Sequence, residues 1–355
     1  MGKRIAMVGV GALGGYVGGH LARAGHDVTL IDFWPANIEA IRTRGLMLDG
    51  MTDEERFTVE GVTAMHVSDV QSLACQAPID IAMVSVKSYD TEWATMLIRQ
   101  YLAPGGFVVS LQNCLNEERI AGIVGWGRTV GAIASMISVD MPEAGKVLRT
   151  VPKMGGRHTV FRVGEVHGRM SRRIEDLVEL FSLVDSAKAT TNLWGERWSK
   201  LVLNGMANGV SAATGLPMVE VNRDDAVRRF SIKLAGEAVR IGQALGFELE
   251  KIGKFEAEQW ALAAEGDAEA LAAIEKDLIP KETTSNPRDA MRRPSMAQDV
   301  LKGRRTEIEF INGYIAAKGA EIGMEAPSHV MLTELVKGVE RGTVTPSPAL
   351  LGGTA

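Results

Sequence analysis

The sequence predicts an α/β protein in which a doubly wound parallel sheet is followed by an all-α domain. Three observations support this: an apolar run that ends in a glycine-rich turn near the N-terminus, alternating strand and helix patterns through residues 5–111, and helical patterns almost throughout from residue 194. Alternation favours a parallel sheet because each helix returns the chain to the same end of the sheet. The 355 residues are enough for two domains.

The glycine-rich turn has the form G-x-G-x-x-G and lies between a predicted strand and a predicted helix, residues 5–8 and 12–24. The first glycine makes a tight turn, the second lets the backbone approach a pyrophosphate, and the third lets helix and strand pack closely. The N-terminus of the helix adds N–H donors and a partial positive charge. The motif predicts a Rossmann dinucleotide-binding domain, against the alternative of a purely structural turn. The cofactor-binding residues expected here are Gly9, Gly11, Ala12, Leu13 and Gly14.

An acidic residue, Asp32, follows the second predicted strand, residues 26–31. A carboxylate about 20 residues after the glycines accepts hydrogen bonds from the ribose hydroxyls of NAD and repels the 2′-phosphate of NADP. No basic residue follows before Arg42. We therefore expect NAD rather than NADP as the cofactor.

The remaining elements of the first half continue the alternation. We predict a helix at 35–45, a strand at 61–66, a buried strand at 79–86, a helix at 91–101, a turn at Pro104-Gly105-Gly106 and a strand at 107–111. Ligands of such sheets bind at the carboxyl ends of the strands. Lys87 and the run Gln112-Asn113-Cys114 directly follow strands, so they are expected beside the cofactor.

The second half is predicted to be helical, with helices at 195–214, 224–245, 255–264, 268–278, 296–302, 307–322 and 329–341. We expect a nucleotide-binding domain over residues 1–190, a helical substrate and dimerisation domain over 191–342, and a flexible tail over 343–355. The charged segment 248–288 is a candidate lid, an oligomer contact or a solvated helical hairpin.

Composition excludes several classes of protein. The net charge of −5 and the lack of a basic stripe argue against nucleic-acid binding. The longest apolar runs have the length of strands, which argues against a membrane span, and the N-terminus has no signal-peptide pattern. Two cysteines are too few for a disulfide framework, and no His, Cys, Asp or Glu grouping has metal-ligand spacing. We expect a cytoplasmic protein without a metal.

The predicted helix at 195–214 carries Lys200, Asn204 and Asn208 at steps of four. This spacing places them on one stripe that climbs about 12 Å. Asn is a poor helix former, so two of them on one face of an apolar helix need an explanation. They either satisfy buried backbone groups or face water, or they form a polar wall opposite a nicotinamide, with Lys200 as the proton donor.

Two further polar clusters lie at 294–299 and 306–313. Ser295 with Gln298, and Thr306 with Glu309, fit capping boxes that merely start helices. Because helix N-termini also bind carboxylates, Ser295 could instead hold an anionic substrate. The local sequence does not decide between these roles.

The chain resembles the ketopantoate reductase (2-dehydropantoate 2-reductase) family. The matching pieces lie in order from residue 5 to about residue 339: the glycine turn, Val84-Ser85-Val86-Lys87, Leu111-Gln112-Asn113, the run from Trp198 to Asn204, Asn208, and the two clusters from Ser295 to Asp299 and from Thr306 to Gly313. The resemblance implies a Rossmann domain and a helical domain with the active site in the cleft between them.

The resemblance also implies individual roles. Lys200 would be the proton donor, and Asn113 would border both cofactor and substrate. Lys87 and Glu307 would contact the cofactor, and Asn204, Asn208 and Ser295 would hold the substrate. An ammonium group can stabilise and then protonate the oxygen that becomes negative when a 2-oxo acid accepts a hydride.

The sequence departs from the family pattern at three places. Asp32-Phe33 stands where many members have an arginine, Cys114 where glycine is usual, and Pro217-Met218-Val219 where many members have Asn-Gly. The expected activity is hydride transfer between a nicotinamide and the C2 carbonyl or hydroxyl of a small 2-oxo or 2-hydroxy acid, with ketopantoate as the default. The alternatives are a related dehydrogenase acting on another hydroxy compound or polyol, and a non-catalytic NAD-binding sensor. A homodimer formed through the helical domain is expected.

Overall fold

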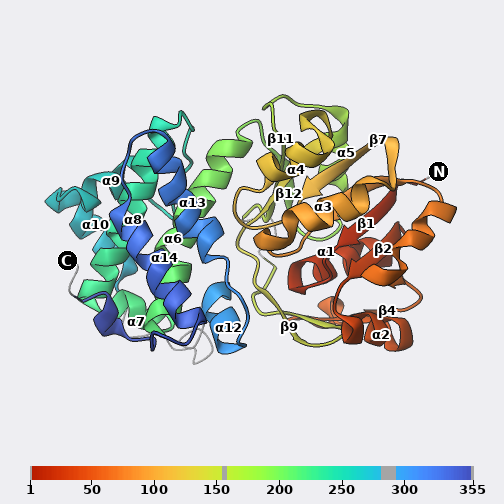
Figure 1. The fold of residues 1–355 in the computed structure, drawn as a ribbon, viewed down its shortest axis with the longest axis horizontal. Coiled ribbons are helices and arrows are strands. Elements are labelled where there is room, and N and C mark those ends of the chain that lie inside the picture. The colour runs from red at the N-terminus through yellow and green to blue at the C-terminus, as the bar shows by residue number, and fades with distance from the viewer. Residues whose placement is uncertain (1, 154–157, 281–292, 353–355) are drawn as a thin grey trace. The chain divides into compact units, whose positions relative to one another are not determined.

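The computed structural model describes residues 2–153, 158–280 and 293–352. The chain divides into two compact units, Met1–Leu193 and Trp194–Ala355. Each unit is described by itself below, with the element labels of Figure 1.

The first unit is built on an eight-stranded sheet of order β12-β11-β8-β7-β6-β1-β2-β5. Its neighbouring strands pair in parallel except for β11, which is antiparallel to β8. The chain leaves β1 toward β2 and returns on its other side at β6, so the strand order reverses between β1 and β6. The strands are β1 (Arg4–Val8), β2 (Asp27–Asp32), β5 (Thr63–His66), β6 (Ile79–Val84), β7 (Leu102–Ser110), β8 (Thr129–Ala134), β11 (Phe161–Glu165) and β12 (Ala187–Ala189).

Helices cover both faces of this sheet because successive side chains of each strand point to opposite sides. Ile5 and Met7 of β1 share a core with α1 (Ala12–Arg23), α2 (Pro35–Arg44) and α5 (Arg172–Ser182). Ala6 and Val8 share the other core with α3 (Thr91–Arg99) and α4 (Glu117–Val124). The central strands are therefore mostly apolar, as in Ile5–Val8 of β1 and Ile81–Val84 of β6, which is typical of parallel strands buried on both faces.

A second sheet of four strands lies against α1, with order β4-β3-β10-β9. Its strands are β3 (Leu46–Asp49), β4 (Phe57–Val59), β9 (Val139–Glu143) and β10 (Lys146–Arg149). Glycines of α1 allow both sheets to approach. A Cβ at Gly18 would lie 2.7 Å from Leu30 Cδ2 of the large sheet, and one at Gly19 would lie 2.6 Å from Leu48 Cδ1 of the small sheet. Helix α1 is thus packed between two sheets.

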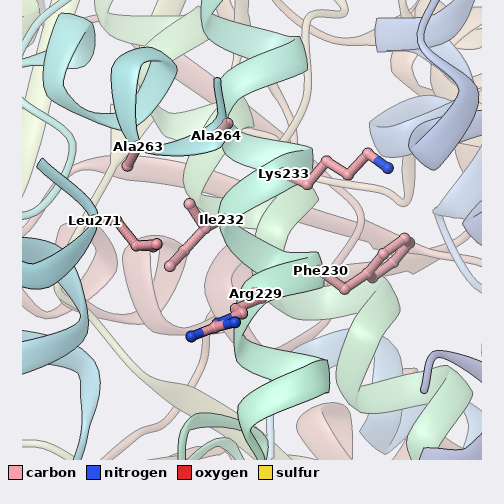
Figure 2. Close-up of a pocket in the computed structure, with 7 residues that line it drawn as sticks. All are labelled: Arg229, Phe230, Ile232, Lys233, Ala263, Ala264 and Leu271. Carbon is pink, nitrogen blue, oxygen red and sulfur yellow. The ribbon is translucent and has the colours of Figure 1, made fainter. Parts of the chain in front are cut away.

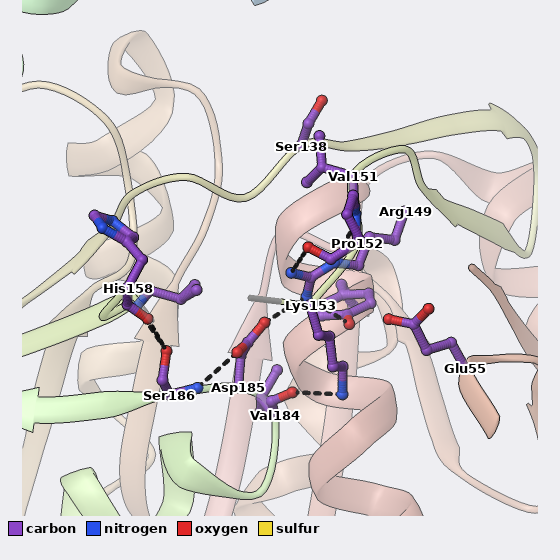
Figure 3. Close-up of polar contacts among 12 residues, drawn as sticks. Glu55, Ser138, Arg149, Val151, Pro152, Lys153, His158, Val184, Asp185 and Ser186 are labelled. Atoms are coloured by element: carbon purple, nitrogen blue, oxygen red, sulfur yellow. Dashed lines mark hydrogen bonds and ion pairs between the residues drawn. The ribbon is translucent and has the colours of Figure 1, made fainter. Parts of the chain in front are cut away.

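A buried polar cluster joins the small sheet to the rest of the unit (Figure 3). Arg149, at the end of β10, is fully buried; its guanidinium lies 2.7 Å from the Asp185 carboxylate and donates to Tyr16 Oη at 3.0 Å. Lys153 donates to the carbonyl of Val184 at 3.0 Å. Burial lowers the pKa of Lys153, and burial lowers that of the neighbouring His20 to about 3. The carboxylate of Asp185 therefore balances a buried positive charge within the fold.

The second unit is formed by helices, coloured green to blue in Figure 1. Its long helices are α6 (Leu193–Thr214) and α8 (Asp225–Ala244), whose inner faces are fully buried at positions such as Trp198, Val202 and Leu234. The other helices are α7 (Met218–Arg223), α9 (Ala257–Ala264), α10 (Ala268–Leu278), α12 (Ser295–Leu301), α13 (Ile308–Glu321) and α14 (Pro327–Glu340). The charged segment 248–288 contains α9 and α10, and α9 packs on α8. Residues 281–288 lie outside the described part.

Four helices of this unit meet at the buried His329 of α14. Its Nε2 lies 2.9 Å from the carbonyl of Leu234, so Nε2 carries the hydrogen and Nδ1 is an acceptor. The amide Nδ2 of Asn312 lies 3.0 Å from that Nδ1 and also donates to the carbonyl of Gly205 at 2.9 Å. Burial lowers the pKa of His329 to about 4, which keeps the ring neutral.

The predicted fold class, an N-terminal parallel α/β part followed by a largely helical part, is confirmed. The prediction of a turn at Pro104-Gly105-Gly106 is wrong, because these residues lie inside β7. Ile79 pairs with Leu102 and Ile81 with Phe107, so the glycines form an irregularity in the strand rather than its start.

The predicted tail, 343–355, contains a short 3-10 helix, Pro348–Leu350, and Leu351 is buried; residues 353–355 lie outside the described part. None of the helices in the described ranges is both long enough and apolar enough to cross a bilayer.

Candidate functional site

The glycine turn has the backbone that a dinucleotide needs. Gly9 has φ +95° and donates its N–H to the carbonyl of Ile31 at 2.8 Å, and a Cβ there would lie 2.7 Å from the nitrogen of Val86. A Cβ on Gly14 would lie 2.0 Å from the carbonyl oxygen of Gly9. Both positions therefore require glycine.

Gly11 differs from the other two glycines. A Cβ added there meets nothing within 4 Å, and Gly11 itself is exposed. It is the N-cap of α1, so no side chain caps the first N–H groups of that helix, which belong to the half-buried Ala12 and Leu13. A helix N-terminus left open in this way suits a pyrophosphate. Packing within the fold does not require glycine at this position.

Asp32 lies at the end of β2 and is largely buried, with 6% of its surface exposed. Its two carboxylate oxygens accept the N–H groups of Val10, at 2.6 Å, and Trp34, at 2.8 Å. Burial raises its pKa, and these backbone bonds oppose that shift. Asp32 therefore helps to shape the glycine turn. Arg42, the next basic residue, is occupied by the carbonyl of Ala64 and the carboxylate of Asp69.

Polar residues follow β6 and β7 at the same edge of the sheet. Lys87 is half-buried and is the N-cap of the 3-10 helix Ser88–Asp90. Gln112 donates to the carbonyl of Val86 at 2.8 Å, which ties the two strand ends together. Asn113 is half-buried, and its carbonyl accepts from Asn116 Nδ2 at 2.9 Å.

Cys114 is buried and has φ +67°, in the left-handed region that favours glycine. This geometry gives a physical reason for the glycine usual at this position in the family that the sequence resembles.

In the helical unit, Lys200 and Asn204 lie on the less buried side of α6, whose other faces contain Trp198, Leu201 and Val202 with at most 1% exposed. Asn208, one turn further on, is 8% exposed. The amide Nδ2 of Asn204 is buried and has no hydrogen-bond partner. This donor therefore does not satisfy a buried backbone group, which was one of the alternatives for the stripe. An unpartnered buried donor is costly and is expected where a ligand supplies the acceptor.

Neither predicted capping box is present. Ser295 is the exposed first residue of α12, whose N-cap is Pro294, and Gln298 donates to the carbonyl of Arg293. Glu307 is the N-cap of α13 and is 6% exposed, without capping that helix by its side chain.

Glu309, the expected partner in the second box, instead pairs with Arg305 and Lys337. The box is absent because α13 begins at Ile308 with Glu307 as its N-cap, so Thr306 lies before the cap and its Oγ1 accepts the N–H of Ile308 instead.

Two features near these residues were not predicted. Asn37, fully buried in α2, donates to the carbonyl of Val10 at 2.9 Å and accepts the N–H of Gly145 at 2.8 Å. It therefore links the glycine turn to Gly145, between β9 and β10, and no local sequence pattern marks it.

The second feature is a groove of about 290 Å³ on the helical unit, between α8 and the α9–α10 pair (Figure 2). No predicted site residue lines it. Its lining residues are Arg229, Phe230, Ile232, Lys233, Ala263, Ala264 and Leu271. In the described part of the chain, no group of three or more His, Cys, Asp or Glu side chains could hold a metal ion.

Comparison with known proteins gives matches along nearly the whole chain. The family model "Ketopantoate reductase PanE/ApbA" matches residues 5–159, and the model of the corresponding C-terminal domain matches residues 192–340. A 2-dehydropantoate 2-reductase of Archaeoglobus fulgidus is 28% identical over 341 residues, covering 96% of this chain and 99% of the relative.

Solved structures agree with this match. A PanE/ApbA family ketopantoate reductase from Ralstonia eutropha is 27% identical with a TM-score of 0.74, covering 96% of this chain and 99% of the other. D-Mandelate dehydrogenase, solved with NADH and anilino(oxo)acetate, has a TM-score of 0.77 at 21% identity, with 96% and 99% coverage, and shows the fold alone.

Proposed function

Because the chain belongs to the ketopantoate reductase family of NAD(P)-dependent oxidoreductases, we propose that it reduces the C2 carbonyl of 2-dehydropantoate with NADH. The observation that carries the substrate side of this proposal is the unpartnered Nδ2 of Asn204, one helical turn from Lys200. A 2-oxo acid offers carboxylate and carbonyl oxygens as acceptors for this donor.

The glycine turn fits the cofactor. Gly9, Gly11, Ala12, Leu13 and Gly14 would hold the pyrophosphate at the N-terminus of α1, with Asp32 on the ribose. Lys87, Asn113 and Glu307 are proposed to contact the cofactor as well. When bound, the nicotinamide supplies the hydride.

The side chains of the chain itself supply the rest of the chemistry. Lys200 would hold its ammonium proton toward the C2 oxygen, stabilise the negative charge that develops there, and donate the proton. Asn113, Asn204, Asn208 and Ser295 would orient the acid. Amide and hydroxyl groups do this without adding a positive charge that would bind the anion more tightly in its ground state.

We propose NAD as the cofactor because Asp32 keeps a carboxylate beside the turn, and because Arg42 is already bound to Asp69 and Ala64. A 2′-phosphate would meet this carboxylate without a free arginine to balance it. We also propose that the protein is cytoplasmic and forms a homodimer through the helical unit. Sedimentation of the purified chain would test the oligomeric state.

A second candidate is the same reaction on another small 2-oxo or 2-hydroxy acid. It is favoured by Pro217-Met218-Val219, which stands where many members of the family have Asn-Gly. Pro217 is the N-cap of α7 and Met218 its first residue, so no asparagine amide is available there.

The test is a spectrophotometric panel of NADH and NADPH with 2-dehydropantoate and other 2-oxo acids, together with the reverse reactions. We expect NADH oxidation with 2-dehydropantoate and a loss of roughly 10²–10⁴-fold in kcat for Lys200→Ala. Lys233→Ala, in the groove of Figure 2, is the matched control and should keep full activity.

Three results would count against parts of the proposal. Near-normal kcat in Lys200→Ala would remove the proton-donor role. Turnover only with other acids would favour the second candidate. NADH binding without any turnover would indicate a sensor.

A further inference from the structure

Two exposed aromatic side chains meet beside the glycine turn. Phe33 is 54% exposed and Trp93 is 42% exposed, yet their ring centroids lie only 6.5 Å apart with an angle of 88° between the planes. Phe33 follows Asp32 at the end of β2, and Trp93 lies in the first turn of α3, after β6. Large apolar rings left in water cost free energy, so a pair of them at one place suggests a ligand.

The backbone holds both rings in place. The carbonyl of Phe33 lies 3.1 Å from His66 Nε2, which donates to it, and the N–H of Trp34 is bound by Asp32. On α3, Ala94 and Ile98 are fully buried against the sheet, which leaves the neighbouring Trp93 on the solvent side. The corner formed by the two rings, here called the Phe33–Trp93 corner, is therefore positioned by the fold.

The position of this corner follows from the topology. Strands β2 and β6 flank β1, and the strand order reverses between β1 and β6. Dinucleotides bind outside the carboxyl ends of the strands at such a reversal, with the adenosine ribose on the acidic residue that ends β2. The base attached to that ribose then comes next to the residue that follows Asp32, which is Phe33.

We propose that the Phe33–Trp93 corner binds the adenine ring of the nicotinamide cofactor, a role that rests on the cofactor part of the proposed function. Perpendicular rings cannot sandwich a flat base. The purine lies flat against one ring while its edge meets the other, an arrangement that aromatic groups favour. Stacking of a base on an aromatic side chain corresponds to roughly 5- to 150-fold in affinity.

The test uses ADP-ribose, which contains the adenine, ribose and pyrophosphate but no nicotinamide, so its binding is independent of catalysis. Its Kd is measured by calorimetry on the full chain and on Phe33→Ala, Trp93→Ala and Trp93→Phe. The control is Met96→Ala, because Met96 is 55% exposed on the same helix. We expect a roughly tenfold rise in Kd for each alanine variant, a smaller rise for Trp93→Phe and none for the control.

A second measurement does not depend on the alanine variants folding. ADP-ribose should change the tryptophan fluorescence of the wild-type chain, and this change should be lost in Trp93→Phe. A Kd within twofold of wild type in both alanine variants, or a fluorescence change that persists in Trp93→Phe, would overturn the proposal.

The two proposals fail in different ways. If ADP-ribose binds through the corner but no 2-oxo acid is reduced, the proposed function fails and the corner stands. If the wild-type chain does not bind ADP-ribose, the corner and the cofactor assignment fail together. If ADP-ribose binds equally well to all variants while NADH reduces 2-dehydropantoate, only the corner fails.

Discussion

The buried ring of His329 should make the helical unit lose stability as the pH falls from 7.5 to 5. The pKa of an unfolded histidine is about 6.5, whereas burial lowers that of folded His329 to about 4. Between these two values the unfolded chain binds the proton and the folded chain does not, so protonation favours unfolding. The stability that the neutral ring retains above pH 6.5 is lost as the pH falls, and the loss levels off below about pH 4.

The magnitude follows from the two pKa values. A shift from 6.5 to about 4 corresponds to a total of about 3 kcal/mol, of which about 2 kcal/mol is lost by pH 5. The structure explains why the folded ring resists the proton. A hydrogen on Nδ1 would face the Asn312 amide, whose Nδ2 is already committed to the carbonyl of Gly205.

The assay is urea unfolding of the intact chain at pH 7.5 and pH 5, followed by circular dichroism and tryptophan fluorescence. The free energy of unfolding of wild type should fall by about 2 kcal/mol more than that of His329→Gln, which has no titrating group there. Ser328→Ala, at a buried neighbour on the same helix, is the control and should behave like wild type. An equal fall in wild type and His329→Gln would refute the reasoning.

Three further changes have defined outcomes. Arg149→Met should reduce the free energy of unfolding by roughly 3–5 kcal/mol, because it leaves the Asp185 carboxylate buried without its partner. Adding Asp185→Leu should restore part of that loss. Urea unfolding curves that show no recovery in the double variant would contradict this account. Gly14→Ala should lower the free energy of unfolding by about 1–3 kcal/mol, because its Cβ clashes with the glycine turn. Gly11→Ala should leave the Tm unchanged and weaken NADH binding. Equal Tm values for the two variants would argue against the assigned roles. Asp32→Asn should narrow the preference for NADH over NADPH about tenfold in kcat/KM, since a carboxylate no longer repels the 2′-phosphate, and an unchanged ratio would remove Asp32 from cofactor selection.

The sequence was informative where short-range rules decide the structure. The strand β6 and the glycine turn were predicted correctly. A strand buried on both faces leaves a continuous apolar run, and a tight turn leaves glycines at fixed spacing. The second sheet was missed because its strands are short, and because its two local hairpins, β3–β4 and β9–β10, are joined only by a long-range pairing. Strand β10 pairs with β3, about 100 residues earlier, and β9 has the mixed sequence Val-Asp-Met-Pro-Glu, with no residue fully buried. Such pairing leaves no periodicity in either segment.

The candidate site also divides into residues marked by a local pattern and residues that depend on distant partners. Gly9 and Gly14 could be assigned from spacing alone, and the structure supplies the steric reason. The role of Asn37 could not be assigned, since it depends on Gly145, 108 residues further along the chain. The capping boxes failed for the opposite reason. A local pattern was present, but α12 and α13 have Pro294 and Glu307 as their N-caps rather than Ser295 and Thr306, so neither pair has the register of a capping box.

The packing of α1 between two sheets has a consequence for synthesis on the ribosome. All the residues expected to hold the pyrophosphate emerge within the first 14 positions, but the strand β10 that covers the outer side of α1 ends at Arg149. A nascent chain of 120 residues would carry the complete fingerprint without its cover. The first unit should therefore gain protease resistance and nucleotide affinity only after the hairpin of β9 and β10 has left the exit tunnel.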